Sequence, residues 1–366
     1  MLDLIDAPLN TGADAYQLQR QAVAERYTAL KAGTQTTQAT RARGVAQALG
    51  ITEAQWVAAS CGPIKSLHLS GTGQSVFGQL EALGEVMALT RNDSCVHERH
   101  GTYLNIQAKG PMGLVLGNDI DLRVFFSGWQ DVFAVQEAGR KSLQFFNAQG
   151  VAVHKVYCTE RTDMASYLAL VQDNVQAHQW PTTQTKAVSH RPDEVTDSAA
   201  FRQAWLTLSD THDFFPMLAK FNVSRLGALS HAGQDLAQKI DKSGVQAMLQ
   251  SAASSGLAIM CFVGNPGMIQ IHTGPVQQIV TRGSWLNVLD PTFNLHLNMD
   301  DVVSAWVVNK PTDDGWVTSL EVFDANGELI VQFFGARKPG KPELTGWRDL
   351  MASLCHTPLA NASPAS

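Results

Sequence analysis

This 366-residue chain has no large excess of positive or negative charge, no paired cysteines and no long apolar runs. Only 16% of its residues are charged and the formal net charge is −6, so a surface for nucleic acid or anionic membranes is not expected. The five cysteines are scattered and form no CxxC pair, which argues against a disulfide framework or a structural zinc site. The N-terminal segment has neither a basic start nor an apolar run. We therefore expect no secretion, no membrane insertion and a cytoplasmic location.

Apolar residues make up 45% of the chain, enough for a substantial core, and the length fits two domains of ordinary size. A helix is expected over residues 13–32. Short strands are expected over residues 86–157, where apolar and β-branched runs are broken by Gly, Asn and Asp. Residues 163–173 again favour a helix. Residues 178–200, rich in Pro and Thr, are predicted to be an exposed linker, and the tail over residues 356–366 is predicted to be disordered.

One local pattern imitates a DNA-binding motif and another imitates a dinucleotide-binding motif. Residues 41–60 resemble a DNA-binding helix-turn-helix, but the second helix, TEAQWVAAS, has no Lys or Arg to meet phosphates. Gly71, Gly73 and Gly78 follow a strand pattern with the spacing GxGxxxxG, and no acidic residue follows where a ribose would be bound. A DNA-binding regulator and a nicotinamide oxidoreductase therefore stay as remote alternatives.

The second half of the chain repeats the first. RNDSCVHERHG (91–101) has the spacing of GNPGMIQIHTG (264–274), and SLQFFNAQGVAVHKVY (142–157) matches SLEVFDANGELIVQFF (319–334) without a gap. DLRVFFSGW (121–129) corresponds to NLHLNMDDVVSAW (294–306) with four residues inserted, and RGVAQALGITEAQ recurs as LGALSHAGQDLAQ. We predict an α+β fold with a tandem duplication, in which each half is a helical segment plus a large antiparallel sheet. The first repeat spans residues 1–177 and the second spans residues 201–355.

The two repeats differ at positions that are candidates for function. His212 stands opposite Ala29, and Arg123 stands opposite His296. His212 lies in the motif DTHDFFPML, where Asp210 can cap a helix and two phenylalanines follow. On this pattern alone, His212 is either a half-buried packing residue or a ligand.

Familiar catalytic motifs are absent. His97 and His100 are three apart on an expected strand and so point to opposite faces, which argues against a metal site. The chain has no HExxH, P-loop or GxSxG sequence, and Asp313 and Asp314 are interpreted as a hairpin turn. No hydrolase chemistry is indicated.

Aromatic and cationic residues are plentiful in the strands and helix starts of the second half. Such residues suit a flat apolar ligand with acidic groups, and haem is one such ligand because its iron accepts a neutral imidazole. An ordinary sheet core with charges at its rim remains the alternative. The residues concerned are Phe215, Phe262, Lys310, Gln332, Phe333 and Arg337.

Nearly the whole chain resembles the HemS/ChuS/PhuS family of bacterial haem-handling proteins, also called hemin-degrading factors. The resemblance is carried by RNDSCVHE, IDLRVFFSGW, SLQFFNAQGVAVHKVY, DTHDFFPML, IMCFVGNPGMIQIHTGPV, WLNVLDPTFNLHL and KPTDDGWVTSLEVFDANGELIVQFFGARKPG. It implies a duplicated α+β unit whose two sheets stack, with haem in a cleft reached by both halves. It further implies that His212 is the proximal iron ligand and that Arg123 reaches the distal side. The implied propionate and pocket contacts are Arg225, Lys310, Gln332 and Arg337, and the implied aromatic walls are Phe125, Phe215 and Phe262.

The resemblance also implies a role in haem uptake and iron acquisition, with haem either degraded or passed on as by a chaperone. Degradation would need an external electron donor, with NAD(P)H as a candidate, because the chain has no flavin or iron–sulfur motif. The expected partners are a haem uptake transporter and a haem oxygenase or reductase, with no nucleic acid. The protein is expected to be a monomer or a homodimer.

Overall fold

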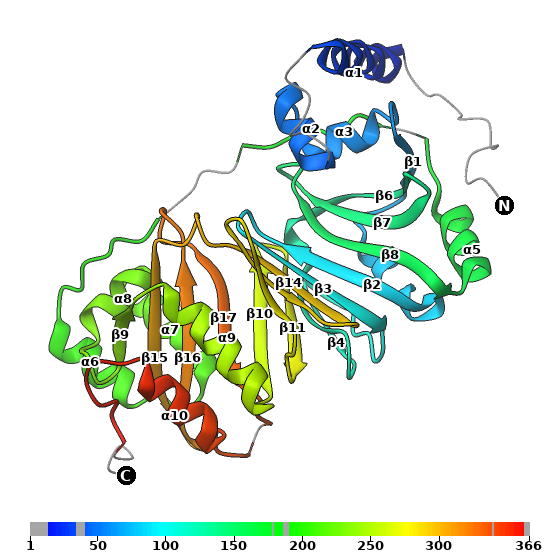
Figure 1. Cartoon of the computed structure of the whole chain (residues 1–366). Coiled ribbons are helices and arrows are strands. Elements are labelled where there is room, and N and C mark those ends of the chain that lie inside the picture. Colours follow the sequence, from blue (N-terminus) through cyan, green and yellow to red (C-terminus); the bar gives the residue numbers. More distant parts are fainter. Residues whose placement is uncertain (1–13, 34–40, 178, 186–189, 339, 362–366) are drawn as a thin grey trace. The chain divides into compact units, whose positions relative to one another are not determined.

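The computed structural model describes residues 14–33, 41–177, 179–185, 190–338 and 340–361. The chain forms two compact units, labelled by element in Figure 1. Unit 1 comprises Met1–Thr90, Glu98–Ala187 and Asn265–Gln270, and unit 2 comprises Arg91–His97, Val188–Gly264 and Ile271–Ser366. The chain thus passes from unit 1 to unit 2 inside the predicted linker, of which residues 178 and 186–189 lie outside the described residues. Each unit also includes a short segment of the other repeat, which the sequence did not indicate.

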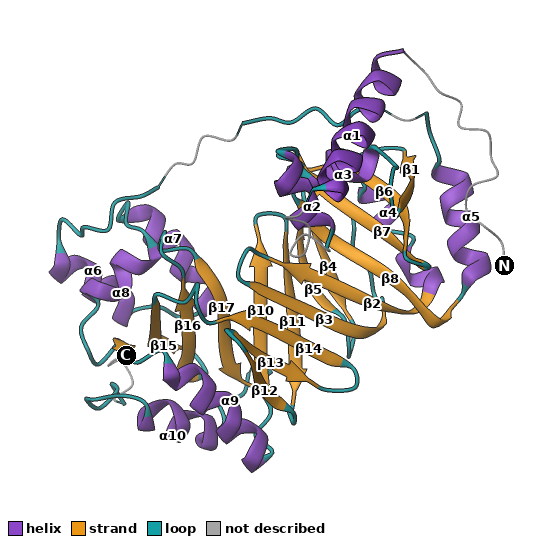
Figure 2. Cartoon of the chain, turned by 45° about the horizontal axis from the view of Figure 1, so that its top comes forward, coloured by secondary structure: helices purple, strands orange, loops and turns teal. Residues whose placement is uncertain are grey.

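Two large sheets dominate the structure, as Figure 2 shows, which confirms the predicted α+β class. Their strand orders are β1-β6-β7-β8-β2-β3-β14-β13-β12 and β4-β5-β11-β10-β17-β16-β15-β9. The first-half strands are β1 (Ile64–Leu69), β2 (Gly84–Arg91), β3 (Cys95–Thr102), β4 (Met112–Leu116), β5 (Asp121–Phe125), β6 (Trp129–Glu137), β7 (Arg140–Asn147) and β8 (Ala152–Thr162). The second-half strands are β9 (Ala237–Ile240), β10 (Ile259–Asn265), β11 (Met268–Gly274), β12 (Ile279–Arg282), β13 (Trp285–Leu289), β14 (Phe293–Asn298), β15 (Ser304–Thr312), β16 (Gly315–Phe323) and β17 (Leu329–Gly335).

In unit 1, alternate residues of β6 and β7 enter two different cores, as expected when successive side chains of a strand point to opposite faces. Phe133 and Phe146 pack with helices α1 (Asp14–Ala32), α2 (Ala42–Leu49) and α3 (Glu53–Ala58). Val132 and Phe145 pack on the opposite face with α4 (Gln74–Phe77), η1 (Leu80–Leu83) and α5 (Met164–Asn174). A further turn, η2 (Phe126–Gly128), precedes β6. The helices expected over residues 13–32 and 163–173 are therefore present, each within one residue of its predicted start.

The segment that imitates a DNA-binding motif is a packing element. Thr52 and Gln55 form a capping box at the start of α3. Five of the six α3 residues are buried, and Glu53 accepts a 2.6 Å hydrogen bond from Lys155. A helix buried in this way cannot present side chains to DNA bases. The glycine segment after β1 is also a turn, because α4 has only four residues and offers no long helix to a dinucleotide.

In unit 2, β15, β16 and β17 are covered on both faces. Helices α9 (Ser243–Ser255) and α10 (Thr345–Ser353) pack on one face against Leu320 and Phe333. On the other face, α6 (Ser198–Leu206), α7 (Phe214–Lys220) and α8 (Arg225–His231) pack against Val308 and Phe323. Figure 2 shows the two helix groups on either side of these strands. Among the described residues, no helix combines the length and the apolar character needed to cross a membrane.

The register of the strands corrects the predicted position of the four-residue insertion between the repeats. Gln144 and Glu321 occupy the same position of the matched block, and their cross-strand partners are Phe133 and Trp306. Phe133 of the first repeat is therefore equivalent to Trp306 of the second, whereas the sequence comparison had matched Trp129 to Trp306. The four extra residues lie in the β15–β16 hairpin, whose turn at Asp313 and Asp314 confirms the predicted hairpin.

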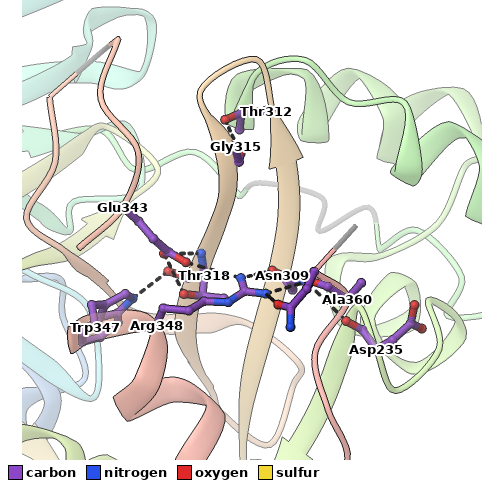
Figure 3. A network of polar contacts seen from close by, with 10 residues as sticks. Asp235, Asn309, Thr312, Gly315, Thr318, Glu343, Trp347, Arg348 and Ala360 are labelled. Atoms are coloured by element: carbon purple, nitrogen blue, oxygen red, sulfur yellow. Dashed lines mark hydrogen bonds and ion pairs between the residues drawn. The ribbon is translucent and has the colours of Figure 1, made fainter. Parts of the chain in front are cut away.

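The end of the described chain is fastened to β15 (Figure 3). Arg348 on α10 donates hydrogen bonds to Asn309 Oδ1 and to the carbonyl oxygen of Ala360, each at 2.7 Å. Asn309 also donates to Ala360 at 3.1 Å, and Trp347 donates to the carbonyl oxygen of Thr318 at 3.0 Å. For residues 356–361 these contacts correct the predicted disordered tail, since Leu359 is also buried. Residues 362–366 lie outside the described residues.

A buried histidine in unit 1 lies between two hydroxyl groups. His154 Nδ1 lies 2.8 Å from Thr90 Oγ1, and His154 Nε2 lies 2.5 Å from the hydroxyl oxygen of Tyr103. Burial lowers the pKa of His154 to about 3, so its imidazole stays neutral in the folded protein at neutral pH.

We expect His154 to make the folded state less stable in acid. In the unfolded chain His154 binds a proton below about pH 6.5, whereas in the folded protein it does so only below about pH 3. The free energy of unfolding therefore decreases by about 1.4 kcal/mol for each pH unit by which the pH is lowered between these values. Urea unfolding of wild type and His154→Gln from pH 7 to pH 5 measures this contribution. The wild-type curve should fall more steeply, and parallel curves would contradict the assignment.

Candidate functional site

His212 lies in the connection between two helices. Helix α6 ends at Leu206, and Asp210 caps the single 3₁₀ turn η3 (Thr211–Asp213), which leads directly into α7. The sequence placed a helix cap at Asp210, and this local prediction is confirmed. The corresponding segment of the first repeat is the uninterrupted helix α1. The turn that carries His212 is therefore specific to the second repeat.

The imidazole of His212 is directed outward and oriented by a carboxylate. Its side chain is 91% exposed, so the packing interpretation is wrong. Asp210 Oδ1 accepts two hydrogen bonds from His212, one from the backbone N–H at 2.8 Å and one from Nδ1–H at 2.6 Å. With Nδ1 protonated and engaged, Nε2 is the nitrogen that remains for a ligand.

The two phenylalanines after His212 have different environments. Phe214 is buried and packs against Trp205, with ring centroids 4.8 Å apart, which anchors the start of α7. Phe215 is 61% exposed, because neighbouring residues of a helix point in directions about 100° apart. An aromatic ring is therefore exposed three residues from His212.

Beneath α7 and α8 lies a fully buried carboxylate, Glu321 on β16. Arg225 donates to it through Nε and Nη2, both at 2.7 Å, and Lys310 and Ser319 each donate at 3.0 Å. Burial alone would raise the pKa of Glu321, but Arg225 and Lys310 hold that pKa well below its ordinary value. Burial also lowers the pKa of Lys310 to about 8, although Glu321 opposes this shift. We call Arg225, Lys310, Ser319 and Glu321 the Glu321 cluster.

The Glu321 cluster also contacts the aromatic residues of α7. Lys310 Nζ lies 4.4 Å from the ring centroid of Phe214. The guanidinium carbon of Arg225 lies 5.1 Å from the Phe214 ring and 5.3 Å from the Phe215 ring. These cation–π distances connect the segment that carries His212 to the sheet.

A row of side chains continues from Glu321 across the sheet. Glu321 is paired in register with Gln332, and Gln332 with Phe262, so all three side chains are on the same face. Phe262 contacts Phe334 edge to face at 5.2 Å, and Phe262, Gln332 and Phe334 are only half-buried. Beyond the end of β17, Arg337 forms an ion pair with Asp314 at 3.3 Å. Unit 2 thus groups the predicted aromatic, amide and cationic residues on and around one sheet face, except Phe333. Phe333 is fully buried on the opposite face against α9 and α10, so the expectation that it faces the ligand is wrong.

Unit 1 holds the two remaining predicted site residues. Arg123 and Phe125 are on the same face of β5, two residues apart, while Leu122 and Val124 on the other face are fully buried. Arg123 Nη1 pairs with Asp121, and its side chain is 34% exposed. Its guanidinium therefore keeps further N–H groups accessible to a ligand.

Within the part of the chain that the structure describes, no group of three His, Cys, Asp or Glu side chains could hold a bare metal ion. His212 offers a single nitrogen donor. One donor of this kind suits a metal that already has its other ligands, as an iron porphyrin does. The chemistry of the donor set therefore fits haem.

Two residues of the site were not predicted in these roles. Glu321 was seen only as part of a strand, and Asp210 only as a helix cap. The signal for Glu321 was present, because the matched position of the first repeat is the neutral Gln144. For Asp210, the D-x-H spacing allows one carboxylate to serve both the backbone and the imidazole.

Comparisons with known proteins agree with these features. The family model described as "Haemin-degrading HemS.ChuX domain" matches residues 50–174 and again residues 222–354, which confirms the duplication. The hemin transport protein HemS of Yersinia enterocolitica is 38% identical over 331 residues, covering 87% of this chain and 94% of its own length. The hemin transport protein HmuS of Yersinia pestis is 36% identical over 329 residues, with the same coverage of both chains.

Solved structures extend the comparison to the fold. The heme-binding protein PhuS of Pseudomonas aeruginosa, in its holo form, has a TM-score of 0.86 and 42% identity, covering 92% of this chain and 99% of its own. ChuS, an Escherichia coli heme oxygenase, has a TM-score of 0.81 and 37% identity, covering 91% of this chain and 99% of its own. With the repeated domain and these full-length matches, the chain belongs to the HemS/ChuS/PhuS family of haemin-degrading HemS.ChuX domain proteins.

Proposed function

We propose that this protein binds ferric haem through His212 and serves haem uptake and iron acquisition in the cytoplasm. The observation that carries the proposal is the exposed imidazole of His212, held by Asp210 with Nε2 left open. The aromatic and cationic groups of unit 2 support it, because a porphyrin needs apolar contacts for its ring and donors for its carboxylates. Family membership and the heme-binding description of PhuS support it further.

Each residue of unit 2 has a proposed part in holding haem. His212 would coordinate the iron, Phe215 and Phe262 would contact the porphyrin ring, and Gln332 and Arg337 would bind at its polar edge. Arg225 and Lys310 would serve the carboxylates through the Glu321 cluster. Bound haem would supply a redox-active iron, and the protein would supply ligation, orientation and electrostatics.

In unit 1, Arg123 is the proposed distal residue and Phe125 a proposed wall. The family resemblance supports this role, and so does the accessible guanidinium of Arg123 beside Asp121. Arg123 would offer a fixed hydrogen-bond donor to the bound group, and such a donor can stabilise developing negative charge.

Degradation of haem is the proposed reaction, driven by an external electron donor such as NAD(P)H. The heme oxygenase description of ChuS supports degradation. The second candidate is a carrier that delivers haem to a separate oxygenase. The hemin transport names of HemS and HmuS support this alternative, as does the full exposure of His212, which would let the ligand leave without unfolding a buried site. An uptake transporter and an oxygenase or reductase are the proposed partners, and the protein would act as a monomer or homodimer.

Replacing His212 tests the ligand. His212→Ala should weaken haem binding and shift the absorption spectrum to that of a different axial ligand, because the only proposed iron donor of unit 2 is lost. Hemin titration followed by absorption measures both effects. His190→Ala, a change at another exposed histidine of unit 2, is the control and should match wild type. An unaltered spectrum for His212→Ala would exclude His212 as the ligand.

Replacing Asp210 tests the orientation of the imidazole. Asp210→Asn keeps a good helix cap but removes the negative charge at Nδ1, so haem affinity should fall by about tenfold, as for other groups that orient a metal-bound histidine. The imidazole also becomes a weaker donor, so the iron reduction potential should rise. Spectroelectrochemical titration measures the potential, and Asp213→Asn is the control because Asp213 bonds Ser209 rather than His212. Equal potentials in all three proteins would contradict this role.

A turnover assay separates degradation from transport. Haem-loaded protein is given NAD(P)H or another reductant with catalase present, so that free peroxide does not destroy the haem. The Soret band should decline as a product appears, and Arg123→Ala should slow the decline on the order of 100-fold, as for loss of one stabilising donor. An unchanged Soret band, with haem passing to an added oxygenase, would favour the carrier.

A further inference from the structure

The Glu321 carboxylate is saturated by its neighbours. Oε1 accepts from Arg225 Nη2, Lys310 Nζ and Ser319 Oγ, while Oε2 accepts from Arg225 Nε. These four donors fill the roughly four acceptor positions that a carboxylate offers. Glu321 is fully buried and thus has no direct access to a ligand. Its effect must be exerted through the cations that it binds.

The matched positions of the first repeat lack this arrangement. Gln144 stands in the place of Glu321, and its side chain donates to Ser142, the residue matched to Ser319. Lys155 stands in the place of Gln332 and is bound by Glu53 of α3. Glu137 stands in the place of Lys310, because Glu137 pairs with Arg140 as Lys310 pairs with Val317. The buried carboxylate with two cations is therefore a feature of the second repeat.

The two cations differ in what they can still offer. Lys310 is buried, and its ammonium group is held by Glu321 and by the Phe214 ring. Arg225 uses Nε and Nη2 on Glu321, but its buried Nη1 has no hydrogen-bond partner among the residues that the structure describes. A buried guanidinium N–H without a partner is costly, and it indicates a group that is satisfied by a ligand.

The charges lead to the same conclusion. Two cations and one carboxylate leave the Glu321 cluster with one positive charge, enough to balance one ligand carboxylate. Glu321 fixes Arg225 through a bidentate pair, so the direction of Nη1 is set by the sheet rather than by a flexible side chain. Phe215 lies over the guanidinium and is largely exposed, so its ring can move aside without loss of a buried contact.

We propose that Glu321 is a positioning residue that reserves Arg225 Nη1 for one carboxylate of the haem, with Lys310 helping to hold Glu321 in place. This inference rests on the proposed function, because it assigns a role toward the same ligand.

The test compares two porphyrins in Glu321→Gln. Iron protoporphyrin IX has two free carboxylates, whereas its dimethyl ester has the same ring and iron but no carboxylate. Glu321→Gln loses the bidentate pair with Arg225, so affinity for iron protoporphyrin IX should fall about 10- to 100-fold, the usual effect of one charge-assisted hydrogen bond. Affinity for the dimethyl ester should stay at the wild-type value, because nothing on that ligand pairs with Nη1.

Matched variants separate positioning from damage to the fold. Glu53→Gln breaks another buried carboxylate–lysine pair, in unit 1, and should leave both affinities unchanged. Arg225→Lys keeps the positive charge but not the guanidinium group that binds Glu321 through two N–H groups. It should therefore also weaken binding of iron protoporphyrin IX without weakening binding of the dimethyl ester. If Glu321→Gln unfolds, which circular dichroism would reveal, Arg225→Lys carries the comparison alone.

The outcomes are distinct. Selective loss for the free-acid porphyrin supports the role of Glu321, and an equal loss for both porphyrins overturns it, as does no loss for either. If wild type binds neither porphyrin through His212, the proposed function itself fails. If wild type binds and only the selectivity is missing, the proposed function stands and the role of Glu321 falls.

Discussion

The part of unit 2 that carries His212 depends on one buried charge. Without Glu321, Arg225 and Lys310 would place two positive charges beneath α7 and α8 in a region with little water, and burying unpaired charge costs several kcal/mol per ion. With Glu321 present, the same two cations join β16, the β15–β16 hairpin and the start of α8. Their cation–π contacts extend this connection to Phe214 and hence to the turn that carries His212. The exposed His212 is in this way connected to a buried group of ion pairs.

Duplication accounts for the scaffold, and local divergence accounts for the site. Both repeats keep the antiparallel hairpins and the helical cover over one sheet face. In the first repeat that cover includes α3, whose Glu53 binds Lys155 and closes the position that Gln332 occupies in the second. In the second repeat Lys310 takes the place of Glu137, and an interrupted helix brings His212. A few changes on a shared frame thus separate a packed face from a face suited to a ligand.

Much of this could be predicted from local sequence. The strand blocks gave the repeat and the sheets, and the Asp210 cap placed His212 at a helix start. Prediction from the sequence failed where a feature depends on contacts between residues far apart in the chain. Arg225 and Glu321 are 96 residues apart, and nothing near either position indicates their pairing. The insertion was misplaced because Trp129 and Trp306 look alike in sequence, whereas only hydrogen-bond register shows that Phe133 takes the place of Trp306. The tail was taken for disordered because its composition is polar and small, yet Arg348 and Asn309 bind its backbone.

The hydrogen bonds that join Arg348, Asn309 and Ala360 affect the order in which the protein can fold during synthesis. Asn309 belongs to β15, the strand that also carries Lys310, and part of its hydrogen bonding is supplied by Ala360, the residue that Arg348 also binds. A nascent chain that has just emerged through β17 already contains every residue of the Glu321 cluster but not the segment that secures β15. Residues 359–361 must therefore leave the ribosome before β15 is fully secured, so this strand is completed only after translation has passed them.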